Sequence, residues 1–128
     1  MIDDDVDDQL YFRDAVNEVN PQIVCGIANN GLEALQQMEI STPPELIFLD
    51  LNMPIMNGYE FLSSLKSTPR FSKIPVVIIT TSRSTQDIEQ SKKLGASMFF
   101  TKPSNFGTLV SKLKAVLTLD FPHKQFML

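Results

Sequence analysis

The feature that most constrains the fold is a set of short apolar segments, each of which ends at a polar residue. Three such segments contain only bulky apolar side chains: 46–49, 76–79 and 98–100. They are too short to be helices, and runs of this length bounded by turn residues are typical of strands buried on both faces of a parallel sheet. The polar residues at their ends include Asp50, Thr80 and Lys102. Because ligands bind beyond the carboxyl ends of such strands, we expect these side chains to face one crevice.

Amphipathic segments alternate with these strands. Apolar residues recur at helical spacing after positions 8, 31, 58, 84 and 105, although the stripe near Ile88 is thin. A further strand is predicted over 23–28. Before the acidic run, only Met1 and Ile2 remain for a first strand. We therefore expect either upstream residues, which we favour, or a very short strand.

The alternation of strands and helices predicts an α/β fold with a doubly wound parallel sheet and helices on both faces. The 128 residues fit a single domain over 1–119, with a C-terminal tail over 120–128. A net charge of −4 without a basic stripe argues against direct nucleic-acid binding. We find no apolar run long enough to cross a bilayer. The one cysteine, Cys25, cannot form an internal disulfide, which fits a reducing cytoplasm, and we expect it to be buried in a strand.

Five aspartates lie within positions 3–8. Asp7 and Asp8 suit the positive end of a helix that follows. Asp3 and Asp4 are not explained in this way, because they lie where the first strand should end. Together with Asp50 they offer the hard oxygen ligands that Mg²⁺ prefers. We therefore expect a divalent-cation site at the strand ends rather than a solvated acidic cluster.

The strand ends also suit phosphoryl transfer to a carboxylate. A cation and the amine of Lys102 would offset charge on the phosphoryl oxygens, and the hydroxyl of Thr80 could donate to one of them. Asp50 would be the nucleophile that forms an acyl phosphate. Pro103 fixes the direction of the chain after Lys102, and the bond between them is a candidate for the cis form.

The residues that carry this chemistry resemble the receiver domain of two-component response regulators, of the kind found in chemotaxis regulators. The resemblance extends over nearly the whole chain. It rests on four motifs: the acidic pair Asp3-Asp4, Asp50-Leu-Asn-Met-Pro54 with Gly58, Thr80-Thr-Ser82, and Phe100-Thr-Lys-Pro103. It implies a flavodoxin-like five-stranded parallel sheet of order 2-1-3-4-5.

By this resemblance, Asp50 accepts a phosphoryl group from a phosphohistidine on a sensor histidine kinase or a histidine phosphotransfer protein. Mg²⁺ (or Mn²⁺) would be bound by Asp4 directly, by Asp3 partly through water, by Asp50, and by the backbone carbonyl of Asn52. Lys102 would pair with Asp50 and then with the phosphoryl group.

The resemblance also implies a switch in which Thr80 moves inward and Phe99 is the aromatic residue that responds. Asn52 and Ser82 occupy the positions that tune the lifetime of the phosphoryl group, and Pro54 and Gly58 shape the turn. We expect a cytoplasmic signalling domain, not an enzyme beyond its own phosphoryl transfer and slow dephosphorylation. Its output face would be the helix near Ile88, the Phe99 strand and the last helix.

We expect a stand-alone protein that is a monomer or a weak dimer, with a downstream protein target that the sequence does not name. A phosphohydrolase of the haloacid-dehalogenase type would need an aspartate where Asn52 lies. A flavin carrier would need a phosphate-binding loop in place of the acidic run. A receiver-shaped module that is never phosphorylated is harder to exclude, although the acids, Thr80 and Lys102 that it would be expected to lack are present.

Overall fold

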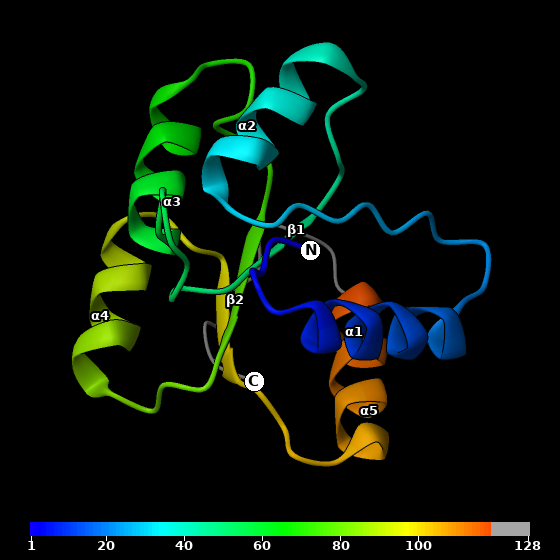
Figure 1. Cartoon of the computed structure of the whole chain (residues 1–128). Helices are drawn as coiled ribbons and strands as arrows, with labels where there is room; N and C mark the ends of the chain where they lie inside the picture. The colour runs from blue at the N-terminus through cyan, green and yellow to red at the C-terminus, as the bar shows by residue number, and fades with distance from the viewer. Residues whose placement is uncertain (119–128) are drawn as a thin grey trace.

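A three-stranded parallel sheet lies at the centre of the computed structural model, which describes residues 1–118 (Figure 1). Its strands are β1 (Ile47–Leu49), β2 (Val76–Thr80) and β3 (Met98–Thr101), in the order β1-β2-β3. Every residue of β1 and β2 is buried, as expected for strands that are apolar on both faces. The predicted positions of these three strands are confirmed.

The segments expected to form the other two strands contribute single bridges. Ile2 forms parallel bridges to Ala28 on one side and to Leu49 on the other. The prediction of a strand over 23–28 is wrong, because only Ala28 pairs and the Val24 side chain is 95% exposed. The segment that pairs with 23–28 is the short stretch from Met1 to Asp3. Within 23–28, its backbone forms hydrogen bonds only with residues 26–28, so the rest of 23–28 has no described strand beside it there. Cys25 is accordingly half-buried and lies outside any strand, contrary to expectation.

Within residues 1–118, five helices cover the sheet. They are α1 (Val6–Val19), α2 (Gly31–Ile40), α3 (Gly58–Ser67), α4 (Thr85–Lys93) and α5 (Phe106–Leu117). Alternate strand residues point to opposite faces, so Ile47 and Leu49 pack with α2 and α3, whereas Phe48 packs with α1 and α5. The sheet therefore lies between two helical layers, as the alternation predicted (Figure 1).

Each helix begins at a residue whose side-chain oxygen accepts a hydrogen bond from a backbone N–H three residues later, which satisfies a group that the first turn leaves unpaired. These residues are Asp5, Asn30, Asn57, Ser84 and Asn105. The caps expected at Ser84 and Asn105 are confirmed. Each cap fixes where the chain leaves a loop at the carboxyl edge of the sheet and enters a helix.

Helix α4 is the least anchored element, as its thin apolar stripe predicted. Of its described residues, Ser91 alone is buried. The helix ends before Gly95, whose φ of 102° favours glycine and confirms the expected helix end. No helix within residues 1–118 is long and apolar enough to cross a membrane. The predicted tail, 120–128, lies outside the described residues.

Candidate functional site

Asp50 follows β1 directly, at the carboxyl edge of the sheet. Its backbone N–H donates to the carbonyl of Ile2 at 3.0 Å, which ties it to the first strand segment, and the residue is only 6% exposed. Burial and, to a smaller extent, the nearby Asp3 raise the pKa of its carboxyl to about 6, against the opposing effect of the Lys102 amine. Burial therefore disfavours the charged form of this carboxyl, and the nearby amine partly offsets that effect.

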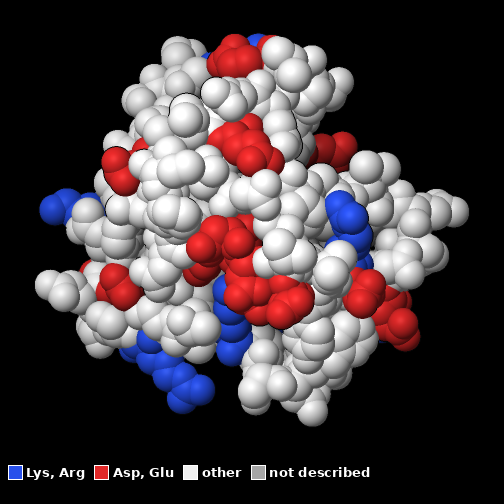
Figure 2. Space-filling model, in the orientation of Figure 1, with Lys and Arg blue, Asp and Glu red and all other residues white. Residues whose placement is uncertain are grey.

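Asp3, Asp4 and Asp50 come together as the sequence predicted. One carboxylate oxygen from each lies within 4.8 Å of the others. Asp3 is fully buried, whereas Asp4 is exposed. Figure 2 shows acidic side chains gathered at the middle of this face of the molecule. Three hard oxygen donors at this spacing fit a divalent cation such as Mg²⁺, which would turn their mutual repulsion into attraction.

The Lys102 amine lies among these acids, but its shortest contacts differ from the expected pair. Its Nζ donates to Asp3 and to Asp8 at 2.8 Å each, and lies 3.7 Å from Asp50 Oδ2. Although burial opposes the charged form, the hydrogen bonds to Asp3 and Asp8 raise the pKa of the amine, so it stays protonated. The expected pairing with Asp50 is present as the longest of three ion pairs.

Asp8 is a site residue that the sequence analysis missed. It lies in the first turn of α1, where it was expected to interact only with the helix dipole. Its half-exposed carboxylate also reaches across to Lys102. Its spacing from the acidic pair carried no signal for this contact, because the partner is 94 residues further along the chain.

Gln9 was missed as well. Its side chain is buried, and its Nε2 donates to the backbone carbonyl of Asp3 at 2.5 Å and to Asn29 Oδ1 at 2.8 Å. It thereby links α1, the acidic segment and the loop before α2. The sequence offered one signal for this role, because Gln9 is a polar residue on the face of the predicted helix that was expected to be buried.

The predicted switch residues lie on β2 and β3. Thr80 is the last residue of β2 and is fully buried, and its Oγ1 accepts from the backbone N–H of Ser82 at 3.4 Å. Phe99 is fully buried on β3, opposite Ile78. Pro103 follows Lys102 and is half-buried. Ser82 lies in the loop before α4, half-buried.

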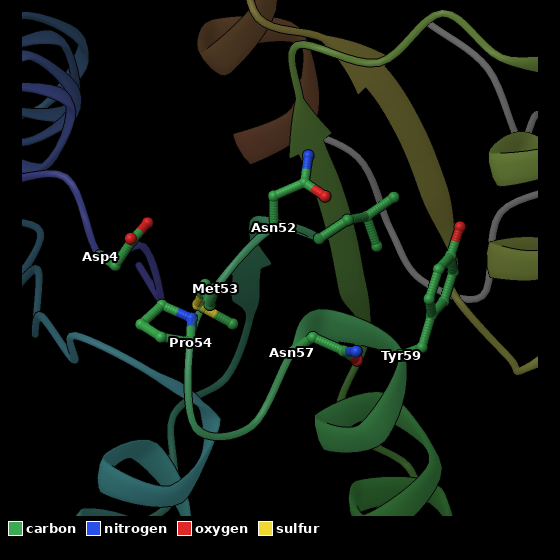
Figure 3. A pocket seen from close by; sticks show the side chains of 7 residues that line it. Asp4, Asn52, Met53, Pro54, Asn57 and Tyr59 are labelled. Carbon is green, nitrogen blue, oxygen red and sulfur yellow. The ribbon is translucent and has the colours of Figure 1, made fainter.

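A pocket of about 440 Å³ opens beside the acids (Figure 3). Asp4 lies on one side of it and Tyr59 on the other, with the 51–57 loop between them. Gly58 closes the loop, because its N–H donates to the Leu51 carbonyl at 3.0 Å and a Cβ there would lie 2.5 Å from the Asp50 carbonyl oxygen. The predicted turn at Pro54 and Gly58 is thus found, with exposed Asn52 on its rim.

Comparisons with known proteins identify this arrangement. The model of the response regulator receiver domain family matches residues 1–114. The chain is 37% identical over 94 residues to the probable transcriptional regulator ycf29 of Pyropia yezoensis, a match that covers 73% of this chain and 42% of that relative. The chain therefore spans less than half the length of that protein.

Two solved structures have the same fold. The phosphorylated cyanobacterial phytochrome response regulator RcpA gives a TM-score of 0.84 at 28% identity, over 95% of both chains. The Mn²⁺-bound form of response regulator Rcp1 gives a TM-score of 0.76 at 28% identity, over 95% of this chain and 96% of that one.

The chain belongs to the response regulator receiver domain family. It has the flavodoxin-like receiver fold and is a signalling domain of the two-component type, as the motifs implied.

Proposed function

We propose that Asp50 accepts a phosphoryl group from a phosphohistidine on a sensor histidine kinase or a histidine phosphotransfer protein, with Mg²⁺ (or Mn²⁺) bound at the acidic cluster. The observation that carries this proposal is the position of the Asp50 carboxylate, within 4.8 Å of Asp3 and Asp4 oxygens and 3.7 Å from the Lys102 amine. A cation held by the carboxylates on one side and the amine on the other would offset the negative charge that a transferring phosphoryl group carries.

In the proposed step, a carboxylate oxygen of Asp50 forms a bond to phosphorus while the bond from phosphorus to the histidine nitrogen breaks. The histidine nitrogen keeps the electron pair of the broken bond. Because the phosphohistidine ring carries a proton on its other nitrogen, the products are an acyl phosphate on Asp50 and a neutral histidine on the donor. Lys102 remains protonated and is close enough to donate to the new phosphoryl oxygens after a small movement from Asp8. Asp50 would attack in its ionised form, which is also the form that would bind the cation.

The cation would be held by the carboxylates of Asp4 and Asp50 and by the Asn52 carbonyl. Asp3 would act partly through water, because its two oxygens already accept from the Asp5 N–H at 3.0 Å and from Lys102. When bound, the cation would offset negative charge on the phosphoryl oxygens. The acids of the metal-free cluster would otherwise repel an incoming phosphoryl group.

Phosphorylation would add about −1.5 to −2 charge at Asp50. Thr80 would then donate its hydroxyl to the phosphoryl group, and its movement would change the space available to Phe99. Of the nearby helices, α4 is the one best able to respond, because Ser91 is its one buried residue among those described. The output face would consist of α4, β3 and α5.

The finer features of the proposal follow the family pattern. Asn52 and Ser82 would tune the lifetime of the phosphoryl group. The bridges from Ile2 to Ala28 and to Leu49 support the family's order of 2-1-3-4-5, in which single bridged residues here take the positions of the first two strands. We also propose a cytoplasmic regulator, a monomer or weak dimer, that loses its phosphoryl group slowly and acts on a downstream protein.

The test is incubation with a small-molecule phosphodonor and Mg²⁺, followed by intact-mass measurement. Wild type should gain one phosphoryl group, and Asp50→Asn and metal-free samples should gain none. A gain that persists in Asp50→Asn would remove Asp50 as the acceptor. No gain in the wild type would favour a receiver-shaped module that is never phosphorylated.

A further inference from the structure

Three polar side chains from different segments meet between α3 and α4. The Tyr59 hydroxyl, in the first turn of α3, donates a short hydrogen bond to Asp87 Oδ1 in the first turn of α4. The Ser82 hydroxyl, in the loop before α4, donates to Asp87 Oδ2 at 2.5 Å. Both oxygens of one carboxylate are thus engaged, one by the preceding loop and one by the neighbouring helix.

Ser82 is fixed from several other directions. Its Oγ accepts from the Ser84 N–H at 3.1 Å, and its carbonyl accepts from the Thr101 hydroxyl at 3.1 Å. Its own N–H contacts Thr80 Oγ1 at 3.4 Å. Any movement of the Ser82 loop therefore involves the hydroxyl of Thr80, which is the group expected to reach the phosphoryl group.

The hydroxyl of Ser82 has a single proton, which it gives to Asp87. In this arrangement it cannot also donate toward the site at Asp50. The bonds to the carboxylate are charge-assisted and so are stronger than neutral ones. In agreement, the hydrogen bonds from Ser82 and Tyr59 hold the pKa of Asp87 below its usual value, and burial together with Asp87 raises the pKa of Tyr59.

We propose that Tyr59 and Asp87 are positioning residues that hold Ser82 and the 81–84 loop in the resting arrangement and must release them when Thr80 engages a phosphoryl group. This inference rests on the proposed function. Tyr59 also lines the pocket beside Asp4, so the contact joins the wall of the site to the helix that is least anchored (Figure 3). A bond that stabilises only the resting arrangement opposes phosphorylation.

Tyr59→Phe tests this inference because it removes one hydroxyl and keeps the ring. The rate at which a small phosphodonor with Mg²⁺ phosphorylates the protein should rise about tenfold or more, as expected for losing one hydrogen bond to a charged group that is present only in the resting arrangement. Asp87→Asn should raise the rate similarly. The double variant should match the faster single variant, because both changes break the same contact. Tyr11→Phe, which removes the same atom from the tyrosine on α1, should leave the rate unchanged.

A second readout does not need phosphorylation. In the unphosphorylated protein, Tyr59→Phe and Asp87→Asn should shift the same backbone amide NMR signals, those of Ser82 and Arg83. Ser82→Ala should reproduce the shift at Arg83, which keeps the test decisive if Asp87→Asn lowers helix stability.

Unshifted loop signals in Tyr59→Phe would overturn the inference. Wild-type rates in both single variants, or rate effects that multiply in the double variant, would also overturn it. If the wild type itself gains no phosphoryl group, the proposed function fails. In that case the amide shifts alone test the positioning role. Shifts of the same loop signals in Tyr59→Phe and Asp87→Asn would support the role, and the absence of these shifts would overturn it.

Discussion

At the scale of single residues, the site depends on how one amine is shared among three carboxylates. Lys102 forms its two shortest contacts with Asp3 and Asp8 and a longer one with Asp50. Of the three carboxylates, Asp50 is therefore the one that the amine contacts least closely, although the amine lies only 3.7 Å away. Asp8 contributes to this arrangement because its carboxylate accepts one of the hydrogen bonds that the Lys102 amine can donate.

Asp8→Asn should lower the free energy of unfolding by about 0.5–1 kcal/mol more than Asp7→Asn does. Both changes remove one carboxylate from the first turn of α1, so they share the loss of the interaction with the helix dipole. Only Asp8 also contacts Lys102. Denaturant unfolding without divalent cations measures the difference. Equal losses in the two variants would show that the contact with Lys102 adds nothing to stability.

Asp50 should make the metal-free protein more stable as the pH falls. Its pKa is about 6 in the folded chain against an ordinary value of 3.8, so its ionised form is disfavoured by folding. The contribution of Asp50 to the free energy of unfolding is therefore fully present at a pH below 3.8 and is lost as the pH rises through about 6. As the pH falls from about 7 to about 5, the free energy of unfolding of the wild type should rise by about 1 kcal/mol, and that of Asp50→Asn should not show this rise.

Chelator-treated samples of both proteins, unfolded by denaturant across this range, give the comparison. Parallel pH profiles for wild type and Asp50→Asn would contradict the assignment of the raised pKa to Asp50. With Mg²⁺ present the sign should reverse, because protonation of a ligand competes with metal binding.

The sequence could predict Asp50, Thr80 and Lys102 as site residues, because the carboxyl ends of parallel strands meet at one edge and each residue ends a strand. It could not predict Asp8 and Gln9. Their roles depend on how α1 is oriented over the sheet, which brings Asp8 to Lys102 and Gln9 to the Asp3 carbonyl.

At the scale of elements, α3 lies at Gly58 against the backbone that directly follows β1. A Cβ at this position would lie 2.5 Å from the Asp50 carbonyl oxygen and 2.7 Å from Leu51 Cα. Gly58→Ala should therefore lower the free energy of unfolding by about 2 kcal/mol. Gly26→Ala is the matched control, because a Cβ there meets nothing within 4 Å. A Gly58→Ala protein as stable as the Gly26→Ala protein would contradict this account of the α3 contact.

The loop between β1 and α3 contains a strained residue. Ile55 has a φ of 68°, which β-branched residues rarely adopt, and the Met56 N–H donates across it to the Pro54 carbonyl at 2.7 Å. Ile55→Gly should raise the free energy of unfolding by about 1 kcal/mol, because the side chain is 75% exposed and little packing is lost.

Val24→Gly is the control for this change, since Val24 is also β-branched and is 95% exposed. Its backbone is not among the described residues with positive φ, so glycine there should not stabilise. Thermal and denaturant unfolding of the two variants would decide the matter. A destabilised Ile55→Gly protein would show that the turn is not strained by its side chain.

The helices and the three strands of the sheet could be predicted because most have a strong apolar pattern, and α4, whose apolar stripe is thin, has a clear cap at Ser84 and a glycine after its end. The segment over 23–28 has a β-rich composition but forms one bridge. Pairing depends on a partner, and the neighbouring segment pairs with it only from Met1 to Asp3. Composition alone does not contain this information.

At the scale of the whole molecule, the alternation of strands and helices was sufficient to predict a parallel sheet between two helical layers. Each crossover returns the chain to the same edge, so residues as far apart in sequence as Asp3, Asp50 and Lys102 meet there. The fold thereby builds a site that no local segment could form. Its arrangement at that edge is the central claim of this account.

Paramagnetic broadening by Mn²⁺ tests that claim most directly. Substoichiometric Mn²⁺ should broaden the backbone amide NMR signals of Asp4, Asn52 and Lys102 together. Signals from the opposite ends of the strands, at Leu46 and Ser97, should remain sharp. Asp4→Asn should weaken the broadening at all three sites. Broadening that spares Lys102, or that is unaffected by Asp4→Asn, would contradict a single cation site shared by the strand ends.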